Sequence, residues 1–147
     1  MKTISQKGLS LIKKWEGLEL EAYRDTGKVW TIGYGHTHEV RAGQKITPEQ
    51  AEQFLREDLQ QAESAVNRLV KKPLRQQEYD ALVSFVFNIG EGQFKSSTML
   101  KMLNKGDMLH AASQFMRWTF DNRKFIQGLE YRRRDEMNLF LSEDSND

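Results

Sequence analysis

The spacing of apolar residues predicts a chain that is mostly helical. Leu9, Ile12 and Trp15 recur on one helical face, which predicts a first helix over about residues 5–15. A longer pattern starts at Thr47-Pro48-Glu49-Gln50, where an N-cap, a first-turn proline and a capping-box glutamine follow in order. Its period of 3.6 residues continues up to Pro73. The sequence therefore predicts one long helix that joins two lobes.

Further helices are expected after Pro73. Residues 76–89 are apolar on nearly every side, which is typical of a helix surrounded by others and predicts the core of the second lobe. Shorter amphipathic helices are expected over residues 98–104, 107–118 and about 129–141. The tail, residues 142–147, is acidic and polar and is expected to be frayed.

The stretch from residue 18 to residue 46 has a different pattern. Short segments rich in Val, Trp, Thr, Ile and Tyr alternate with glycines, which predicts a small antiparallel sheet. The chain of 147 residues fits a single domain. We expect an α+β, mainly α fold, with a small β-hairpin lobe over about residues 1–60 and a helical lobe over about residues 61–147.

Composition and charge narrow the classes of function. The 22 Lys and Arg residues nearly balance the 21 Asp and Glu residues, so no overall charge attracts the protein to nucleic acid or to an anionic membrane. The absence of cysteine excludes disulfides, thiol nucleophiles and Cys-ligated zinc. Charged residues interrupt any apolar signal core near the N-terminus, and the most apolar run, residues 82–87, is far below the roughly 20 residues that span a bilayer. We expect synthesis in the cytoplasm and no stable membrane insertion.

Two carboxylates flank the predicted sheet. Glu16 ends the first helix, and Asp25 opens the turn sequence Asp25-Thr26-Gly27-Lys28. Hydrolysis of a glycosidic bond requires a carboxylic acid that protonates the leaving oxygen and a second carboxylate that activates water or stabilises the transition state. This pair has the chemistry of a glycoside hydrolase.

The residues around this pair carry a resemblance to a known family. The strings are Trp15-Glu16-Gly17, Ala22-Tyr23-Arg24-Asp25 and Trp30-Thr31-Ile32-Gly33-Tyr34-Gly35-His36-Thr37. Later landmarks follow in the same order over residues 79–90, 97–100 and 128–133. The sequence resembles the phage-type lysozymes, the muramidases of glycoside hydrolase family 24, over about residues 4–141. The resemblance implies a lysozyme-like fold and no cofactor.

The resemblance also implies the catalytic roles. Glu16 matches the general acid, Asp25 the second carboxylate, and Thr31 the hydroxyl that holds the attacking water. Glu16 must keep its proton near neutral pH, which calls for partial burial against a wall such as Trp15, Trp30 or Tyr34. On its open turn, Asp25 is expected to stay ionised. We expect attack by water with inversion if the carboxyl groups lie about 6.5–9.5 Å apart, whereas a separation near 5 Å favours retention.

Three residues are predicted to bind the substrate. They are Tyr34, Asn88 and Arg132. Asn88 matches a family position that bonds the sugar, although it is equally suited to end a helix before Gly90. In the family an arginine of the C-terminal segment faces the acid, and we predict Arg132 rather than Arg133 for this place.

The segment from residue 117 to residue 134 is basic. It contains six cations and two anions. The excess of cations predicts either a patch that binds the anionic cell wall or a solvated face with nearby ion pairs. The cations are Arg117, Arg123, Lys124, Arg132, Arg133 and Arg134, and the anions are Asp121 and Glu130.

The histidines and glycines near the catalytic strings have structural interpretations. His36 and His38 suggest zinc, but a third ligand is missing, so no metal is predicted. We expect His36 to tie the hairpin to the long helix by a hydrogen bond. Gly33 and Gly35 are expected to let the hairpin approach another backbone closely.

The predicted protein is a monomeric endolysin. It would hydrolyse the bond from N-acetylmuramic acid to N-acetylglucosamine in bacterial peptidoglycan, after a holin releases it from the host cytoplasm. A lytic transglycosylase on the same substrate is the enzymatic alternative. A catalytically silent module that binds cell wall or nucleic acid through the arginines is an alternative of another class.

Overall fold

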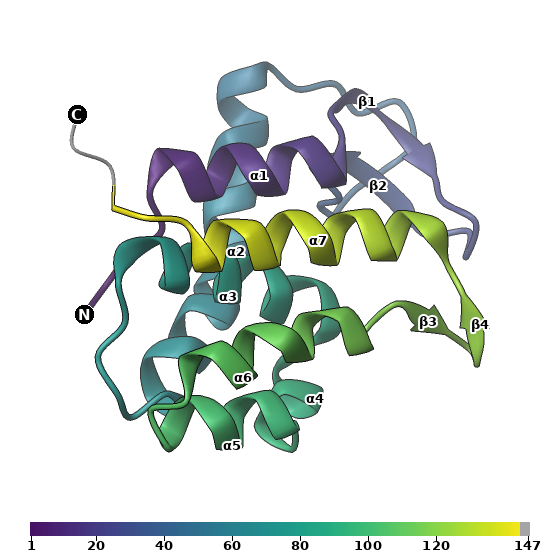
Figure 1. Cartoon of the computed structure of the whole chain (residues 1–147). Helices are drawn as coiled ribbons and strands as arrows, with labels where there is room; N and C mark the ends of the chain where they lie inside the picture. The colour runs from purple at the N-terminus through teal and green to yellow at the C-terminus, as the bar shows by residue number, and fades with distance from the viewer. Residues whose placement is uncertain (145–147) are drawn as a thin grey trace. The chain divides into compact units, whose positions relative to one another are not determined.

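The computed structural model describes residues 1–144 of the chain (Figure 1). The chain forms two compact units, one of residues 12–60 and one of residues 1–11 together with the residues from 61 onward. We call them the hairpin unit and the helical unit. Within residues 1–144, none of the helices is both long and apolar enough to cross a membrane.

The hairpin unit contains the predicted antiparallel sheet. Strand β1 (Glu19–Arg24) pairs with β2 (Trp30–Gly33) in a register that places Tyr23 opposite Thr31. A bulge interrupts this register between Glu19 and Tyr23. Along its other edge, β1 bonds the segment at residues 44–46, where the Ala22 amide donates to the Gln44 carbonyl oxygen at 2.9 Å. Strand β1 therefore has a partner on each side.

Two helices border the strands in sequence, α1 (Gln6–Glu16) and α2 (Pro48–Leu69). Thr47 caps α2 as predicted: its hydroxyl accepts from the Gln50 amide at 3.2 Å, and the Gln50 side chain accepts from the Thr47 amide at 2.9 Å. The predicted role of His36 is also confirmed. Its Nδ1 lies 2.8 Å from Oδ2 of Asp58, and its ring stacks on Phe54, both in α2.

Helix α3 (Gln76–Ile89) forms the core of the helical unit, as its all-round apolar pattern predicts. Phe85 on α3 makes edge contacts with Phe94, Phe115 and Trp118. Helix α7 packs extensively against α3. The other helices are α4 (Glu91–Lys95), α5 (Thr98–Asn104), α6 (Met108–Ser113), the 3-10 helix η1 (Gln114–Arg117) and α7 (Gln127–Leu141).

Two features of the helical unit differ from the prediction. The single helix expected over residues 107–118 is α6 followed by η1, although Asp107 caps α6 by accepting from the His110 amide at 3.2 Å. A short hairpin, β3 (Phe120–Asp121) with β4 (Lys124–Phe125), was not predicted. Its turn places Asn122 and Arg123 at positive φ without any glycine, and glycine is the usual signal for such a turn.

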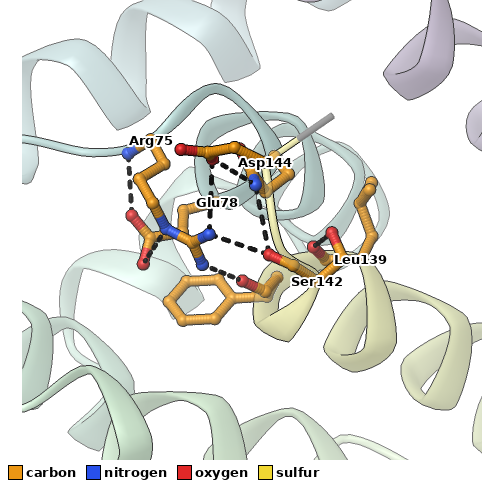
Figure 2. Close-up of polar contacts among 7 residues, drawn as sticks. Arg75, Glu78, Leu139, Ser142 and Asp144 are labelled. Carbon is orange, nitrogen blue, oxygen red and sulfur yellow. Dashed lines mark hydrogen bonds and ion pairs between the residues drawn. The ribbon is translucent and has the colours of Figure 1, made fainter. Parts of the chain in front are cut away.

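The end of α7 is held by residues at the start of α3 (Figure 2). The Arg75 guanidinium donates to the carbonyl oxygens of Ser142 at 2.8 Å and Phe140 at 3.0 Å. The Gln77 side chain donates to the Asp144 carboxylate at 2.7 Å. In the tail expected to be frayed, Ser142 and Asp144 therefore have hydrogen-bond donors from the start of α3, and residues 145–147 lie outside the described residues.

Candidate active site

Glu16 is the last residue of α1 and is half-buried. Its carboxyl lies against Gly35, in the turn that follows β2. Gly35 has a φ of +78°, and a Cβ placed on it would lie only 2.9 Å from Glu16 Oε1. The expectation of a close approach to another backbone is wrong for Gly35, where the neighbouring group is the side-chain carboxyl of Glu16.

Asp25 lies on an exposed turn between β1 and β2, and its carboxyl orientation is fixed by the turn. The Val29 amide donates to Asp25 Oδ1 at 2.8 Å, and the two residues also bond through their main chains at 3.0 Å. The environments of Glu16 and Asp25 thus differ in exposure, as the sequence predicts. A contrast of this kind allows two carboxylates to take different roles.

Thr31 is buried on β2, and its hydroxyl donates to the Val29 carbonyl oxygen at 3.0 Å. A hydroxyl carries one proton and two acceptor lone pairs. Because the proton is donated to Val29 O, the Thr31 oxygen can only accept from a further group. The same residue, Val29, therefore orients both Asp25 and Thr31.

Tyr23, on β1, is a residue near the predicted catalytic strings to which the sequence analysis gave no role. It lies opposite Thr31 in the β1–β2 register. Burial raises the pKa of Tyr23, and the charges of Glu19, Asp25 and Glu16 raise it further.

Tyr34 follows β2 directly and is half-buried. The Lys13 ammonium lies 5.6 Å from the centre of its ring, and Lys13 also forms an ion pair with Glu52 of α2. Tyr34 is therefore held in the same unit as Glu16, Asp25 and Thr31, and its role in binding stays a prediction.

The other two predicted binding residues, Asn88 and Arg132, belong to the helical unit. Asn88 is exposed near the end of α3. The residue that caps this helix is Gly90, with a φ of +94° and an amide that donates to Val86 O at 2.8 Å. Asn88 is therefore not needed to end the helix.

Asn88 borders a pocket of about 350 Å³. The pocket wall also includes Trp118, Phe120, Asp121, Leu129 and Arg133. Oδ1 of Asn88 accepts a hydrogen bond of 2.7 Å from Nη2 of Arg133. Arg133, which the sequence analysis placed second to Arg132, thus contacts Asn88.

Arg132 and Arg133 do not contribute to the surface patch that was one of the two alternatives for this segment. Arg132 and Arg133 are buried around Glu136, which is itself fully buried. Nε of Arg132 lies 3.2 Å from one Glu136 oxygen, and Nε of Arg133 lies 2.8 Å from the other. Arg132 also donates to Ser84 O at 3.3 Å. Burial lowers the pKa of Arg133 to about 10, which leaves it charged at neutral pH.

Four of the six cations in the segment stay exposed. Arg134 pairs with Glu130 at 2.6 Å, as the solvated-face alternative expects. The exposed cations are Arg117, Arg123, Lys124 and Arg134. Within residues 1–144, no group of three or more His, Asp or Glu side chains is placed to hold a metal ion.

Comparison with known proteins identifies the family. The profile described as phage lysozyme matches residues 13–136. The chain belongs to the phage lysozyme family. The lysozyme is 50% identical over 143 residues to an endolysin of Acyrthosiphon pisum secondary endosymbiont phage 1, a match that covers 95% of this chain and 98% of that protein. The match to the endolysin of Bacillus phage B103 is 45% identical over 145 residues, and it covers 97% of the lysozyme but only 55% of that longer relative.

Solved structures show the same relationship. The lysozyme is similar to a mutant of P22 lysozyme, with a TM-score of 0.92 at 41% identity, covering 97% of this chain and 100% of that one. The muramidase domain of SpmX from Asticaccaulis excentricus has a TM-score of 0.91 at 41% identity, with the same coverage. The predicted lysozyme-like α+β fold and glycoside hydrolase activity are therefore confirmed.

Proposed function

We propose that this lysozyme is an endolysin that hydrolyses the bond between N-acetylmuramic acid and N-acetylglucosamine in bacterial peptidoglycan. The observation that carries the proposal is the contrast between a half-buried Glu16 packed on Gly35 and an exposed Asp25. The names of the similar proteins, endolysin and muramidase domain, support the same substrate.

Glu16 acts as the general acid. It donates its proton to the glycosidic oxygen as the bond from that oxygen to the anomeric carbon breaks, so the leaving sugar departs as an alcohol. Glu16 is half-buried at the end of α1, and its carboxyl lies against Gly35.

Asp25 and Thr31 position the attacking water. The Thr31 oxygen accepts one hydrogen of the water, because its own proton is donated to Val29 O. The Asp25 carboxylate accepts the other hydrogen and takes that proton as the water oxygen bonds to the anomeric carbon. A water held by both hydrogens presents a lone pair to the sugar, and attack on the face opposite the leaving oxygen gives inversion.

Tyr34, Asn88 and Arg132 are the proposed binding residues. We also propose that the two lobes, about residues 1–60 and 61–147, work as one monomeric domain. The enzyme would accumulate in the host cytoplasm and reach the cell wall once a holin has permeabilised the membrane.

A turbidity assay on permeabilised Gram-negative cells tests the acid. Glu16→Gln keeps the shape of the side chain but cannot supply the proton, so we expect lysis to slow by about a thousandfold. Glu21→Gln, at an exposed position of the same sheet, is the matched control and should lyse at the wild-type rate. Lysis by Glu16→Gln at the rate of the control would refute the proposal.

The products distinguish hydrolysis from the transglycosylase reaction. Mass spectrometry of digested peptidoglycan should show reducing muramic acid ends, whereas anhydro ends would show that the substrate's own hydroxyl replaces the water. Nuclear magnetic resonance (NMR) of the fresh product should show the anomer opposite to that of the substrate. The retained anomer would assign a nucleophilic role to Asp25.

A further inference from the structure

The side-chain amide of Asn88 has only one orientation that its surroundings permit. We propose that Arg133 locks this amide with its NH2 group toward the pocket of the helical unit, so that Asn88 recognises an amide carbonyl of the substrate. Arg133 is then a positioning residue for substrate recognition. The inference rests on the proposed function, because it takes peptidoglycan as the substrate.

The fixed orientation of the Asn88 amide follows from the hydrogen-bond donors and acceptors of the two groups. A guanidinium has five N–H donors and no acceptor, whereas an amide has a carbonyl oxygen on one side and an NH2 on the other. Nη2 of Arg133 lies 2.7 Å from Oδ1 of Asn88. A flipped amide would bring its NH2 against a cation that can only donate, so the oxygen must face Arg133.

Arg133 itself has no freedom to move away. Its side chain is fully buried, its guanidinium lies 5.1 Å from the centre of the Phe85 ring, and its Nε lies 2.8 Å from Glu136 Oε1. Glu136 is held in turn by the Ser84 hydroxyl, which donates to its other oxygen at 2.6 Å. A continuous polar chain thus runs from Ser84 in the core through Glu136 and Arg133 to the exposed Asn88.

The pocket beside Asn88 suits an amide group. Trp118, Phe120 and Leu129 supply apolar wall that can cover the planar face or methyl of such a group. Asp121, in the same wall, can accept the N–H of an amide whose carbonyl is bonded by Asn88. Peptidoglycan offers this chemistry in two places, the N-acetyl groups of its sugars and the peptide bonds of its stems.

Steady-state kinetics on three peptidoglycan preparations test the inference: intact, de-N-acetylated and freed of stem peptides. Asn88→Asp keeps an oxygen for Arg133 but replaces the donor with an acceptor, and Asn88→Ala removes both. On intact material both variants should raise KM about tenfold with little change in kcat, as expected for one lost hydrogen bond. On the preparation that lacks the recognised amide, wild type and variants should have equal KM values, which identifies the source of the carbonyl.

Asn138→Asp is the matched control, because Asn138 is an exposed asparagine of α7 that lies outside the wall of this pocket. It should keep the wild-type KM on all three preparations. A wild-type KM for Asn88→Asp on intact material would overturn the inference. So would an equal loss for Asn138→Asp, since that result would assign the effect to the added charge.

NMR tests the role of Arg133 without relying on cleavage. The Asn88 side-chain NH2 should be rigid in wild type, mobile in Arg133→Met and rigid again in Arg133→Lys, which restores a cationic donor. It should shift on titration with N-acetylglucosamine oligomers or with stem peptides. A mobile amide in wild type, or no shift with either probe, would overturn the inference even if Arg133→Met fails to fold. Wild type that leaves all three preparations uncut would overturn the proposed function alone.

Discussion

Gly35 and Glu16 are in such close contact that a methyl group on Gly35 would lie 2.9 Å from the Glu16 carboxylate oxygen. Glycine is therefore required at this position for two reasons. Its φ of +78° turns the chain after β2, and its missing side chain leaves room for the carboxyl. The geometry of the proposed general acid is thus set by a residue that carries no chemistry of its own.

Gly35→Ala, compared with a control, separates the effect of the Glu16 contact from the effect of backbone strain. The methyl displaces the Glu16 carboxyl, and a misplacement of about 1 Å can cost roughly a hundredfold in rate, which the turbidity assay would detect. Gly43→Ala is the control, because Gly43 has a similar φ of +81° but nothing within 4 Å of the added Cβ. Both variants should lose about 1–2 kcal/mol of stability to backbone strain. Equal activity of the two variants would show that the contact does not matter.

Thr31 is expected to act through its oxygen. Thr31→Val removes the acceptor for water at nearly constant volume, and we expect the rate of lysis to fall about a hundredfold. Thr31→Ser keeps the hydroxyl and should retain most of the activity. The comparison requires both variants to melt within a few degrees of wild type in circular dichroism. A Val variant as active as the Ser variant would remove Thr31 from the mechanism.

Arg75 should stabilise the end of α7. Arg75→Ala removes the donors to the carbonyl oxygens of Phe140 and Ser142, and because Arg75 is partly exposed we expect a loss of about 1 kcal/mol. Hydrogen exchange should accelerate for amides in the last turn of α7 and not at its start. Arg56→Ala, at a partly exposed arginine paired with Glu52, is the control. It should change neither the stability nor the hydrogen exchange of α7 by a comparable amount.

The stability should depend on Tyr79 at high pH. Burial, followed by the hydrogen bond and charge of Glu63, raises the pKa of Tyr79 above its usual value of about 10. The folded state then keeps a proton that the unfolded chain releases, so this contribution is complete below pH 10 and is lost as the pH rises further.

Tyr79→Phe should therefore cost about 1 kcal/mol at pH 7 in urea unfolding, and this difference from wild type should shrink between pH 10 and pH 11. Tyr131→Phe, at a half-exposed tyrosine, is the control and should show no such trend. A Tyr79→Phe difference that stays constant from pH 7 to pH 11 would contradict the linkage.

Local patterns were sufficient for much of the fold. Thr47 and Gln50, three residues apart, cap the start of α2 reciprocally, so a local sequence pattern was enough to predict where this helix begins. The all-round apolar character of residues 76–89 identifies α3, because only a helix with neighbours on every side buries all of its faces. The His36 contact with α2 was also predictable, since a histidine without a third metal ligand needs another partner.

The features that were not predicted depend on distant residues. Arginines are normally exposed, so burial of Arg132 and Arg133 was not expected. Glu136, three and four residues further along, was the available signal, because residues at these spacings share a helix face. The orientation of Asn88 depends on a residue 45 positions later in the chain, and no local pattern encodes it.

Dissolved ions reach the charges of α7 unequally. Arg134 is exposed and pairs with the half-buried Glu130, and a Debye length of about 8 Å at physiological ionic strength screens this pair. Arg133 and Glu136 expose no surface, so counterions cannot come between them. A rise in salt therefore weakens the pair of Arg134 and Glu130, while the hydrogen bond from Arg133 to Asn88 persists. These two pairs on one helix thus differ in their response to ionic strength.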